Sequence, residues 1–326
     1  MADVGAEPVT MTMKELVSHF EGFLTECEKK GPQTRGTYQR ALREFLRWFP
    51  RDRRFRFTTR DVERYKRHLI ENRELENVSV ATYLTALRRF CQYLIDVSVL
   101  TSNPAEPVVG GRRPTRHSRE FLTYPEVELL LDTVDTSTTS GLRDRSIITM
   151  MLYCALSEHE CIHAQVGDLR RSADGSLRIY VLGKGKSAKD QSVRIPAEAA
   201  EALEAYLDRR YLDDERIQTD PLFPSLSNRS QGKPMTARGM REAVNRWLKA
   251  SGVKGDRDRR LTPFSLRHTA GVMMVDKGAT LEEIMERMRI EWKPTAQIYF
   301  RLRGSLGTVG PGAADRRRKV DEPDET

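Results

Sequence analysis

Cysteine and long apolar stretches are scarce in this sequence of 326 residues, and each scarcity argues against a class of protein. No run approaches the roughly 18–20 apolar residues of a membrane-spanning helix, and the N-terminus lacks an apolar block of the signal-peptide kind. The four cysteines are too few and too scattered for a disulfide framework. We therefore expect a cytoplasmic protein with no membrane partner.

Basic residues outnumber acidic ones, and the excess is concentrated in one segment. The chain has 55 Lys and Arg against 47 Asp and Glu, whereas Arg35–Arg67 alone has twelve basic and four acidic residues, with aromatic residues among them. Basic helices built on an aromatic core suit a nucleic-acid backbone, because each neutralised phosphate releases counterions. A solvated, arginine-rich face is the alternative interpretation of the same pattern.

Apolar residues recur at helical spacing over the first hundred positions, after a patternless lead-in at 1–11. The recurrence predicts a compact all-α domain of four helices over residues 12–104. Residues 105–119 are rich in Pro, Gly and Arg and predict a basic linker.

The second half mixes helical patterns with two short strands. The strands are expected at 177–182 and 192–195, on either side of a Gly-Lys-Gly-Lys turn. These patterns predict a mostly helical domain over 120–303 with a small antiparallel sheet. Residues 304–326 are Gly-rich and then charged, and we expect a disordered tail.

The order of motifs resembles the tyrosine recombinase (phage integrase) family over roughly residues 12–302. The phrases that carry the resemblance are Leu87-Arg-Arg-Phe-Cys-Gln-Tyr-Leu94, Asn103-Pro104-Ala105, Phe121-Leu-Thr-Tyr-Pro-Glu-Val127, Gly141-Leu-Arg-Asp-Arg145, Val181-Leu-Gly-Lys-Gly185, Thr262-Pro-Phe-Ser-Leu-Arg-His-Thr269 and Thr295-Ala-Gln-Ile-Tyr299. The resemblance implies a mainly α protein, in which a SAM-like core-binding domain precedes an integrase-type catalytic domain. It also implies strand cleavage by a tyrosine through a 3′-phosphotyrosyl link, with no metal or nucleotide cofactor.

Several positions match the family's catalytic residues. The resemblance places the nucleophile at Tyr299, the second arginine at Arg267, a histidine often found beside it at His268, and the hairpin lysine at Lys184. Lys186 and Lys189 are possible substitutes for that lysine.

Three family positions are degenerate. Ser157 stands where the first arginine belongs, Phe264 replaces the first residue of the His-x-x-Arg pair, and Ile290 replaces the His or Trp nine residues before the tyrosine. Arg143 also follows Gly-Leu but aligns one helix too early, and Trp292 fills the last position only if the loop is shifted. Because losing one preorganised donor commonly costs about 10²–10³ in rate, we expect impaired or atypical cleavage, or a catalytically inactive DNA-binding accessory.

A remote alternative comes from His159-Glu-Cys-Ile-His163, which satisfies the zinc metalloprotease pattern His-Glu-x-x-His. Glu160 coincides with the glutamate of the recombinase phrase, and no clear third ligand follows, so we expect no metal. We expect double-stranded DNA as partner, with a possible homo-oligomer or second recombinase chain on it, in the nucleoid. The expected DNA contacts are Arg35, Arg40, Arg43, Arg47, Arg112, Arg113, Arg116 and Arg241, less securely joined by Lys233 and the rest of 238–246.

Overall fold

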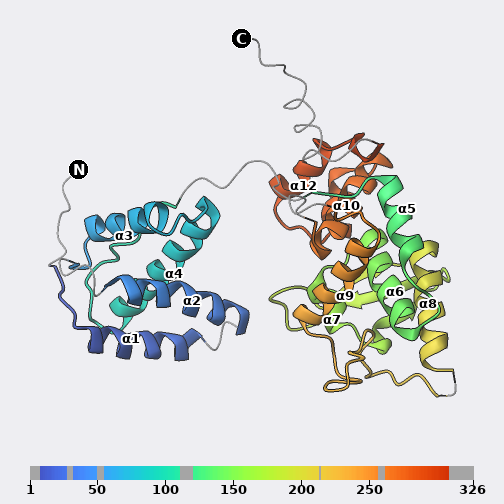
Figure 1. The fold of residues 1–326 in the computed structure, drawn as a ribbon, viewed down its shortest axis with the longest axis horizontal. Coiled ribbons are helices and arrows are strands. Elements are labelled where there is room, and N and C mark those ends of the chain that lie inside the picture. Colours follow the sequence, from blue (N-terminus) through green and yellow to red (C-terminus); the bar gives the residue numbers. More distant parts are fainter. Residues whose placement is uncertain are drawn as a thin grey trace, which may run out of the picture. The chain divides into compact units, whose positions relative to one another are not determined.

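A computed structural model describes residues 8–27, 32–49, 55–110, 120–212, 214–255 and 261–307. The chain divides into two compact units, residues 1–115 and 116–326 (Figure 1). The described residues are mainly helical, with one three-stranded antiparallel sheet, as the sequence predicts. No described helix is both long enough and apolar enough to cross a membrane.

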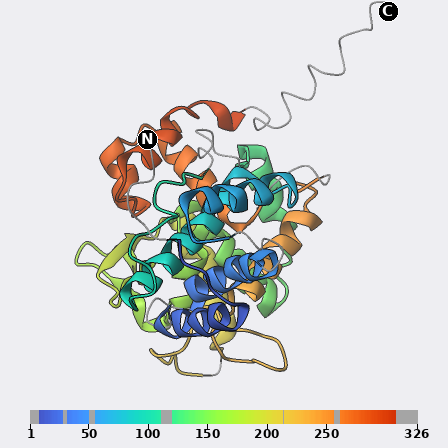
Figure 2. The same ribbon diagram turned by 90° about the vertical axis from the view of Figure 1, so that its left-hand side faces the viewer.

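The N-terminal unit is a bundle of four helices (Figure 2). They are α1 (Met13–Glu26), α2 (Pro32–Trp48), α3 (Thr59–Glu71) and α4 (Asn77–Asp96). Capping boxes begin two of them, because Thr12 and Thr58 each accept a backbone N–H three residues ahead. Their apolar stripes meet in one core, where the Phe45 ring packs edge-on against Phe55 and Tyr65.

The first unit extends past the boundary expected at residue 104. Ala105 and Val108 are buried in its core, and their carbonyl oxygens accept hydrogen bonds from Arg88 of α4 at 3.1 and 2.9 Å. Part of the expected linker is therefore packed structure. Arg112, Arg113 and Arg116 lie outside the described residues.

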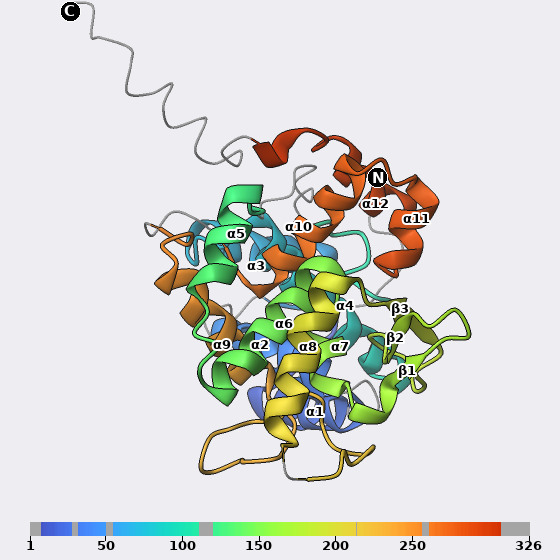
Figure 3. The same cartoon turned by 90° about the vertical axis from the view of Figure 1, so that its right-hand side faces the viewer.

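The C-terminal unit is built around α6, which is buried along most of its length and packs against α8 and α10 (Figure 3). Its helices are α5 (Tyr124–Thr133), α6 (Thr139–Tyr153), α7 (Glu158–His163), α8 (Ala197–Arg210), α9 (Ala237–Ala250), α10 (Pro263–Asp276), α11 (Leu281–Arg287) and α12 (Lys293–Phe300). The short helix α7 lies on the phrase that the recombinase resemblance places one helix after Arg143.

The sheet has the order β1-β2-β3, with strands β1 (Leu169–Arg171), β2 (Leu177–Val181) and β3 (Gln191–Arg194). The expected pair corresponds to β2 and β3, which are antiparallel with Ile179 opposite Val193. The third strand, β1, is too short to carry a readable alternation. At the end of the unit, Leu306 is fully buried, so packed structure continues past the expected start of the tail at 304.

Candidate active site

Arg267 of α10 is held by acceptors from two other segments. Its Nη1 donates to the carbonyl oxygen of Ala155 at 2.6 Å and to Glu160 Oε2 at 3.0 Å, and its Nη2 donates to the Met288 carbonyl. The side chain is 12% exposed. Burial lowers the pKa of Arg267, against the opposing effect of Glu160. An arginine still keeps its charge in proteins, so Arg267 is an oriented buried cation.

Ser157, at the position of the missing arginine, serves as a helix cap. It is the N-cap of α7, where its Oγ accepts the Glu160 N–H at 3.3 Å and its own N–H donates to Glu160 Oε2 at 2.6 Å. This capping box explains why a six-residue helix forms there. The serine supports the position of Glu160 but brings no charge.

A second buried arginine, which the sequence analysis missed, contacts the same carboxylate. Arg289 Nε donates to Glu160 Oε1 at 2.5 Å, and its Nη2 donates to Glu160 Oε2 at 2.9 Å and to the Ala155 carbonyl at 2.8 Å. Its side chain is 7% exposed. Burial raises the pKa of the Glu160 carboxyl, but Arg289, Arg267 and the Ser157 N–H together outweigh burial and lower it. Glu160 is therefore a carboxylate shared by two arginines.

The backbone of Arg289 is unusual. The residue follows the end of α11 and has a φ of 52°, in the left-handed region that glycine normally occupies after a helix. Ala155, whose carbonyl both arginines share, has a φ of 51°. Such a conformation costs a residue with a Cβ about 1–2 kcal/mol. The only sequence signal for Arg289 is its place beside the degenerate Ile290.

Tyr299 and His268 lie against each other. Tyr299, on α12, is 2% exposed and His268, on α10, is fully buried, and their ring centroids are 5.1 Å apart. A Cβ placed on Gly271 would lie 2.5 Å from Cε1 of Tyr299, so only glycine permits this approach of α12 to α10. Tyr299 is near enough to Arg267 to influence its pKa. The structure thus brings Tyr299, His268 and Arg267 together.

Lys184 occupies the exposed turn between β2 and β3. It lies near His159, whose pKa is lowered by burial first, then by His163, with Lys184 contributing. The possible substitutes are engaged elsewhere: Lys189 Nζ pairs with Asp168 at 2.5 Å, and Lys186 Nζ lies 3.6 Å from Glu291, just after Arg289. Among the three lysines, Lys184 is the one with no ion pair to a described residue.

The other degenerate positions have apolar surroundings. Phe264 is half-buried in the first turn of α10, and Ile290 packs against the core that contains Tyr299. Trp292, at the start of α12, is 69% exposed, so it does not take the place of Ile290 in that core.

The His-Glu-x-x-His segment has the wrong arrangement for a zinc protease. Glu160 is fully occupied by the two arginines and the helix cap, while the rings of His159 and His163 stack with centroids 4.1 Å apart. No group of three metal-ligating side chains occurs within the described ranges.

Arg143 belongs to a separate cluster, around Asp144. Arg143 Nε and Nη2 donate to Asp144 Oδ1 at 3.0 and 2.7 Å, while Arg246 and Trp247 of α9 donate to Oδ2. Arg143 also donates to the Pro224 carbonyl. Asp144 thus connects α6 to α9, while Arg143 connects α6 to the loop that precedes α9.

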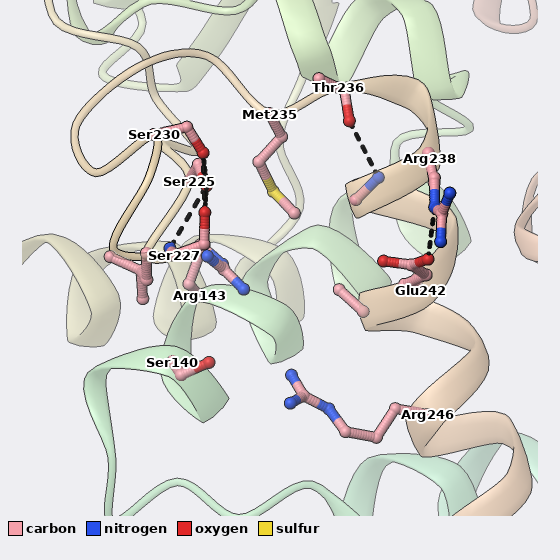
Figure 4. Close-up of a pocket in the computed structure, with 13 residues that line it drawn as sticks. Ser140, Arg143, Ser225, Ser227, Ser230, Met235, Thr236, Arg238, Glu242 and Arg246 are labelled. Carbon is pink, nitrogen blue, oxygen red and sulfur yellow. Dashed lines mark hydrogen bonds and ion pairs between the residues drawn. The ribbon is translucent and has the colours of Figure 1, made fainter.

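Basic side chains line α9 on two sides. A polar depression of about 600 Å³ lies beside its N-terminal end, and its lining includes Arg143, Arg238 and Arg246 and the hydroxyls of Ser225, Ser227 and Ser230. Figure 4 shows Arg143 beside the serines and the other two arginines across the depression. A second depression of about 650 Å³ is lined by Arg238, Arg241, Glu242, Asn245, Arg246, Lys249 and Lys254.

The expected DNA-contacting arginines of the described residues differ in their exposure. On α2, Arg40, Arg43 and Arg47 are exposed and follow helical spacing, whereas Arg35 is half-buried. Arg241 of α9 pairs with Glu158 at 2.8 Å and still exposes 57% of its side chain.

Comparison with known families accounts for both units. The model of the phage integrase family matches residues 120–304, more than half of the chain, and that of the phage integrase N-terminal SAM-like domain matches residues 17–97. The chain belongs to the phage integrase family of tyrosine recombinases.

Related recombinases and solved structures agree with this membership. The tyrosine recombinase XerC of Chlamydia pneumoniae is 28% identical over 246 residues, covering 76% of this chain and 74% of that protein. XerC of Pelotomaculum thermopropionicum is 26% identical over 300 residues, covering 88% and 94%. The XerH recombinase in a post-cleavage complex with a palindromic difH substrate shares the fold, with a TM-score of 0.68 at 16% identity, covering 96% of this chain and 86% of that one. This recombinase thus functions in site-specific recombination, as its family does.

Proposed function

We propose that this recombinase binds duplex DNA and breaks and rejoins one strand through Tyr299, using an atypical catalytic set. The observation that carries the proposal is that Tyr299 packs against His268 and lies close enough to Arg267, which Glu160 holds, to influence the pKa of Arg267. A buried guanidinium beside a phenol is arranged to stabilise the charge that develops on a phosphate as the phenol attacks.

The proposed step conserves bonds and protons. The Tyr299 oxygen attacks the phosphorus, a 3′-phosphotyrosyl bond forms, and the bond to the 5′-oxygen breaks. The phenol gives its proton to solvent water once Tyr299 has turned outward, and the 5′-oxygen gains one from Lys184 in the exposed turn between β2 and β3. Arg267 donates to a non-bridging oxygen, and His268 positions the Tyr299 ring. Because Tyr299 is buried, it must turn outward before it attacks.

Two basic surfaces support DNA binding. Phosphate contacts suit the exposed arginines of α2 and the arginines and lysines along α9. Asn245, which lies among these α9 side chains, is suited to a base edge. Lambda integrase, which shares the fold with a TM-score of 0.60 at 15% identity, has been solved as a dimer on its core site. We propose that two or more copies, or a second recombinase chain, likewise share a site on cytoplasmic nucleoid DNA.

A suicide-substrate assay tests the proposal. Nicked duplexes from the DNA that flanks its own gene are incubated with the protein, and covalent adducts are resolved on a denaturing gel. We expect an adduct with the wild type and none with Tyr299→Phe. An adduct that survives the substitution would exclude Tyr299 as the nucleophile.

A second candidate is an accessory protein that binds recombination sites without cutting them. Ser157 and Phe264 favour it, because neither side chain can supply charge or exchange a proton as the family residues do. Salt-sensitive binding to the same duplexes without an adduct would support this alternative.

A further inference from the structure

We propose that Arg289 supplies the cation that the family draws from the position of Ser157. The inference rests on the proposed strand cleavage and identifies a second arginine that contacts the scissile phosphate. The three observations behind it are the shared acceptors of the two arginines, their remaining donors, and the backbone of Arg289.

The shared acceptors place the two guanidinium groups side by side. Both Arg267 and Arg289 donate to Glu160 Oε2 and to the Ala155 carbonyl, at distances of 2.6–3.0 Å. Ala155 and Glu160 belong to the phrase that in the family would contain the missing arginine. The loop after α11 thus brings a second guanidinium to the same acceptors.

Two arginines and one carboxylate leave a net positive charge in a buried place. Both side chains are at most 12% exposed, and Arg289 lies close enough to help lower the pKa of Arg267. Holding like charges together away from water is unfavourable unless an anion joins them. A phosphate is an anion of the required charge.

Donor hydrogens remain for that phosphate. An arginine has five N–H groups. One Nη1 hydrogen of Arg289, together with the Nε and one Nη2 hydrogen of Arg267, has no acceptor among the described residues. Three hydrogens from two adjacent guanidinium groups match the non-bridging oxygens of a phosphodiester.

The backbone gives an independent reason to assign a role to Arg289. A left-handed residue directly after a helix is most often glycine, yet here it has a long charged side chain. Strained positions of this kind tend to occur at functional sites, because there the side chain must reach one place. The carbonyl oxygen of Met288, the preceding residue, accepts a hydrogen bond from Arg267. This bond fixes the loop after α11 to α10.

The test pairs Arg289→Asn with Arg287→Asn. Asparagine tolerates the left-handed region, so the first variant removes the guanidinium without adding backbone strain. Arg287 is an exposed arginine two residues earlier and serves as the matched control. Each protein is given suicide duplexes that have either the natural phosphate or an uncharged methylphosphonate at the scissile position. Thermal melting shows that each variant is folded.

Two results are expected from the cleavage assay. Arg289→Asn slows adduct formation about 100-fold or more on the natural phosphate, whereas Arg287→Asn changes it less than threefold. On the methylphosphonate the loss caused by Arg289→Asn shrinks to less than tenfold, because less negative charge needs stabilising. An equal loss on both substrates would reduce Arg289 to a support of the fold and overturn the proposal.

A binding measurement decides the matter even if the wild type forms no adduct, in which case the proposed cleavage has failed separately. Tyr299→Phe protein is titrated with both duplexes, with and without Arg289→Asn, after a preferred duplex has been selected from a random-sequence library. We expect the methylphosphonate to weaken binding about tenfold when Arg289 is present and not when it is absent. Independent effects of the two changes would contradict a contact between Arg289 and the phosphate.

Discussion

Two buried carboxylates in the C-terminal unit each hold two arginines, and we propose that one pair acts in catalysis and the other in stability. Asp144 is fully buried and binds Arg143 and Arg246, together with the indole N–H of Trp247. Glu160 binds Arg267 and Arg289. Each cluster combines one carboxylate with two arginines, so the proposed difference in role must come from the residues and solvent around them.

Exposure and neighbours separate the two clusters. Arg246 exposes 55% of its side chain to water, and Arg143 spends further donors on the Pro224 carbonyl, so the charge around Asp144 is dispersed. Both arginines of Glu160 are buried, and Tyr299 lies nearby. A buried pair of arginines becomes a reactive site only where a nucleophile faces it. The following predictions test this difference between the Asp144 and Glu160 clusters.

Exchanging one arginine of each cluster for alanine should separate catalysis from stability. Arg267→Ala should slow adduct formation about 10²–10³-fold, because an oriented donor to the phosphate is lost. Arg143→Ala should leave the rate of folded protein within a few-fold and cost about 3 kcal/mol of stability, because a buried partner of Asp144 is lost. Adduct assays and urea unfolding measure both. An Arg143→Ala protein that forms the adduct slowly but keeps the stability of the wild type would contradict this difference between the clusters.

Neutralising each carboxylate should reveal how many arginines depend on it. Glu160→Gln leaves two buried guanidinium groups unpaired and should cost about 3–5 kcal/mol. Asp144→Asn leaves one, since Arg246 reaches water, and should cost less. Urea unfolding at neutral pH measures the free energy of unfolding of both variants. An equal loss in both would contradict the expectation that Glu160 supports one more buried arginine than Asp144.

The same pair of variants predicts a pH dependence. The folded pKa of Glu160 is lowered, so its contribution to stability is full above the unfolded value of about 4.5. The contribution is lost as the pH falls from there through the folded pKa. Unfolding curves from pH 6 downward should therefore fall more steeply for the wild type than for Glu160→Gln.

A methyl group between α10 and α12 should disturb the Glu160 side of the molecule alone. In Gly271→Ala the new Cβ would lie 2.5 Å from the Tyr299 ring, so the ring must move, at a cost of about 1–3 kcal/mol. Proteolysis after Tyr299 by chymotrypsin should then become faster. Gly239→Ala in the first turn of α9, where a Cβ would make only ordinary contacts, is the control. An unchanged rate in Gly271→Ala would show that α12 moves without exposing the tyrosine.

The smallest effect is expected at the exposed edge of the Asp144 cluster. Arg246→Gln should weaken duplex binding severalfold and lower the slope of log affinity against log salt by about 1, because one phosphate contact is lost. The cleavage rate of saturated complexes should stay unchanged. Binding at several salt concentrations provides the slope, and an unaltered slope would remove α9 from the DNA-binding surface at this position.

Most of the fold could be predicted from sequence, because amphipathic periodicity and capping residues act locally. The four N-terminal helices, the hairpin of β2 and β3, and α8 to α11 all follow from such patterns. The bounds of α7 could not be predicted in this way, because its six residues are too few to show a period and its start depends on the Ser157 capping box. Strand β1 was missed for the same reason of length.

The candidate site divides along the same line. Tyr299, Arg267 and Lys184 stand in recognisable phrases of the family, so the sequence alone was enough to propose them as site residues. Arg289 has no phrase of its own, and its role depends on contacts that span more than 100 positions, to Ala155 and Glu160. The sequence alone therefore did not indicate Arg289 as the proposed replacement for the arginine missing at Ser157.

The packing of Tyr299 on Gly271 has a consequence for fidelity. Exposing an aromatic ring that is 98% covered forfeits about 2–3 kcal/mol of apolar burial. Without bound DNA, only about one molecule in 30–150 would then have Tyr299 exposed. A duplex whose contacts favour the exposed state recovers that fraction, whereas a random duplex does not. Under the proposed cleavage by Tyr299, the close packing that Gly271 permits would thus limit nicking at unrelated DNA sites.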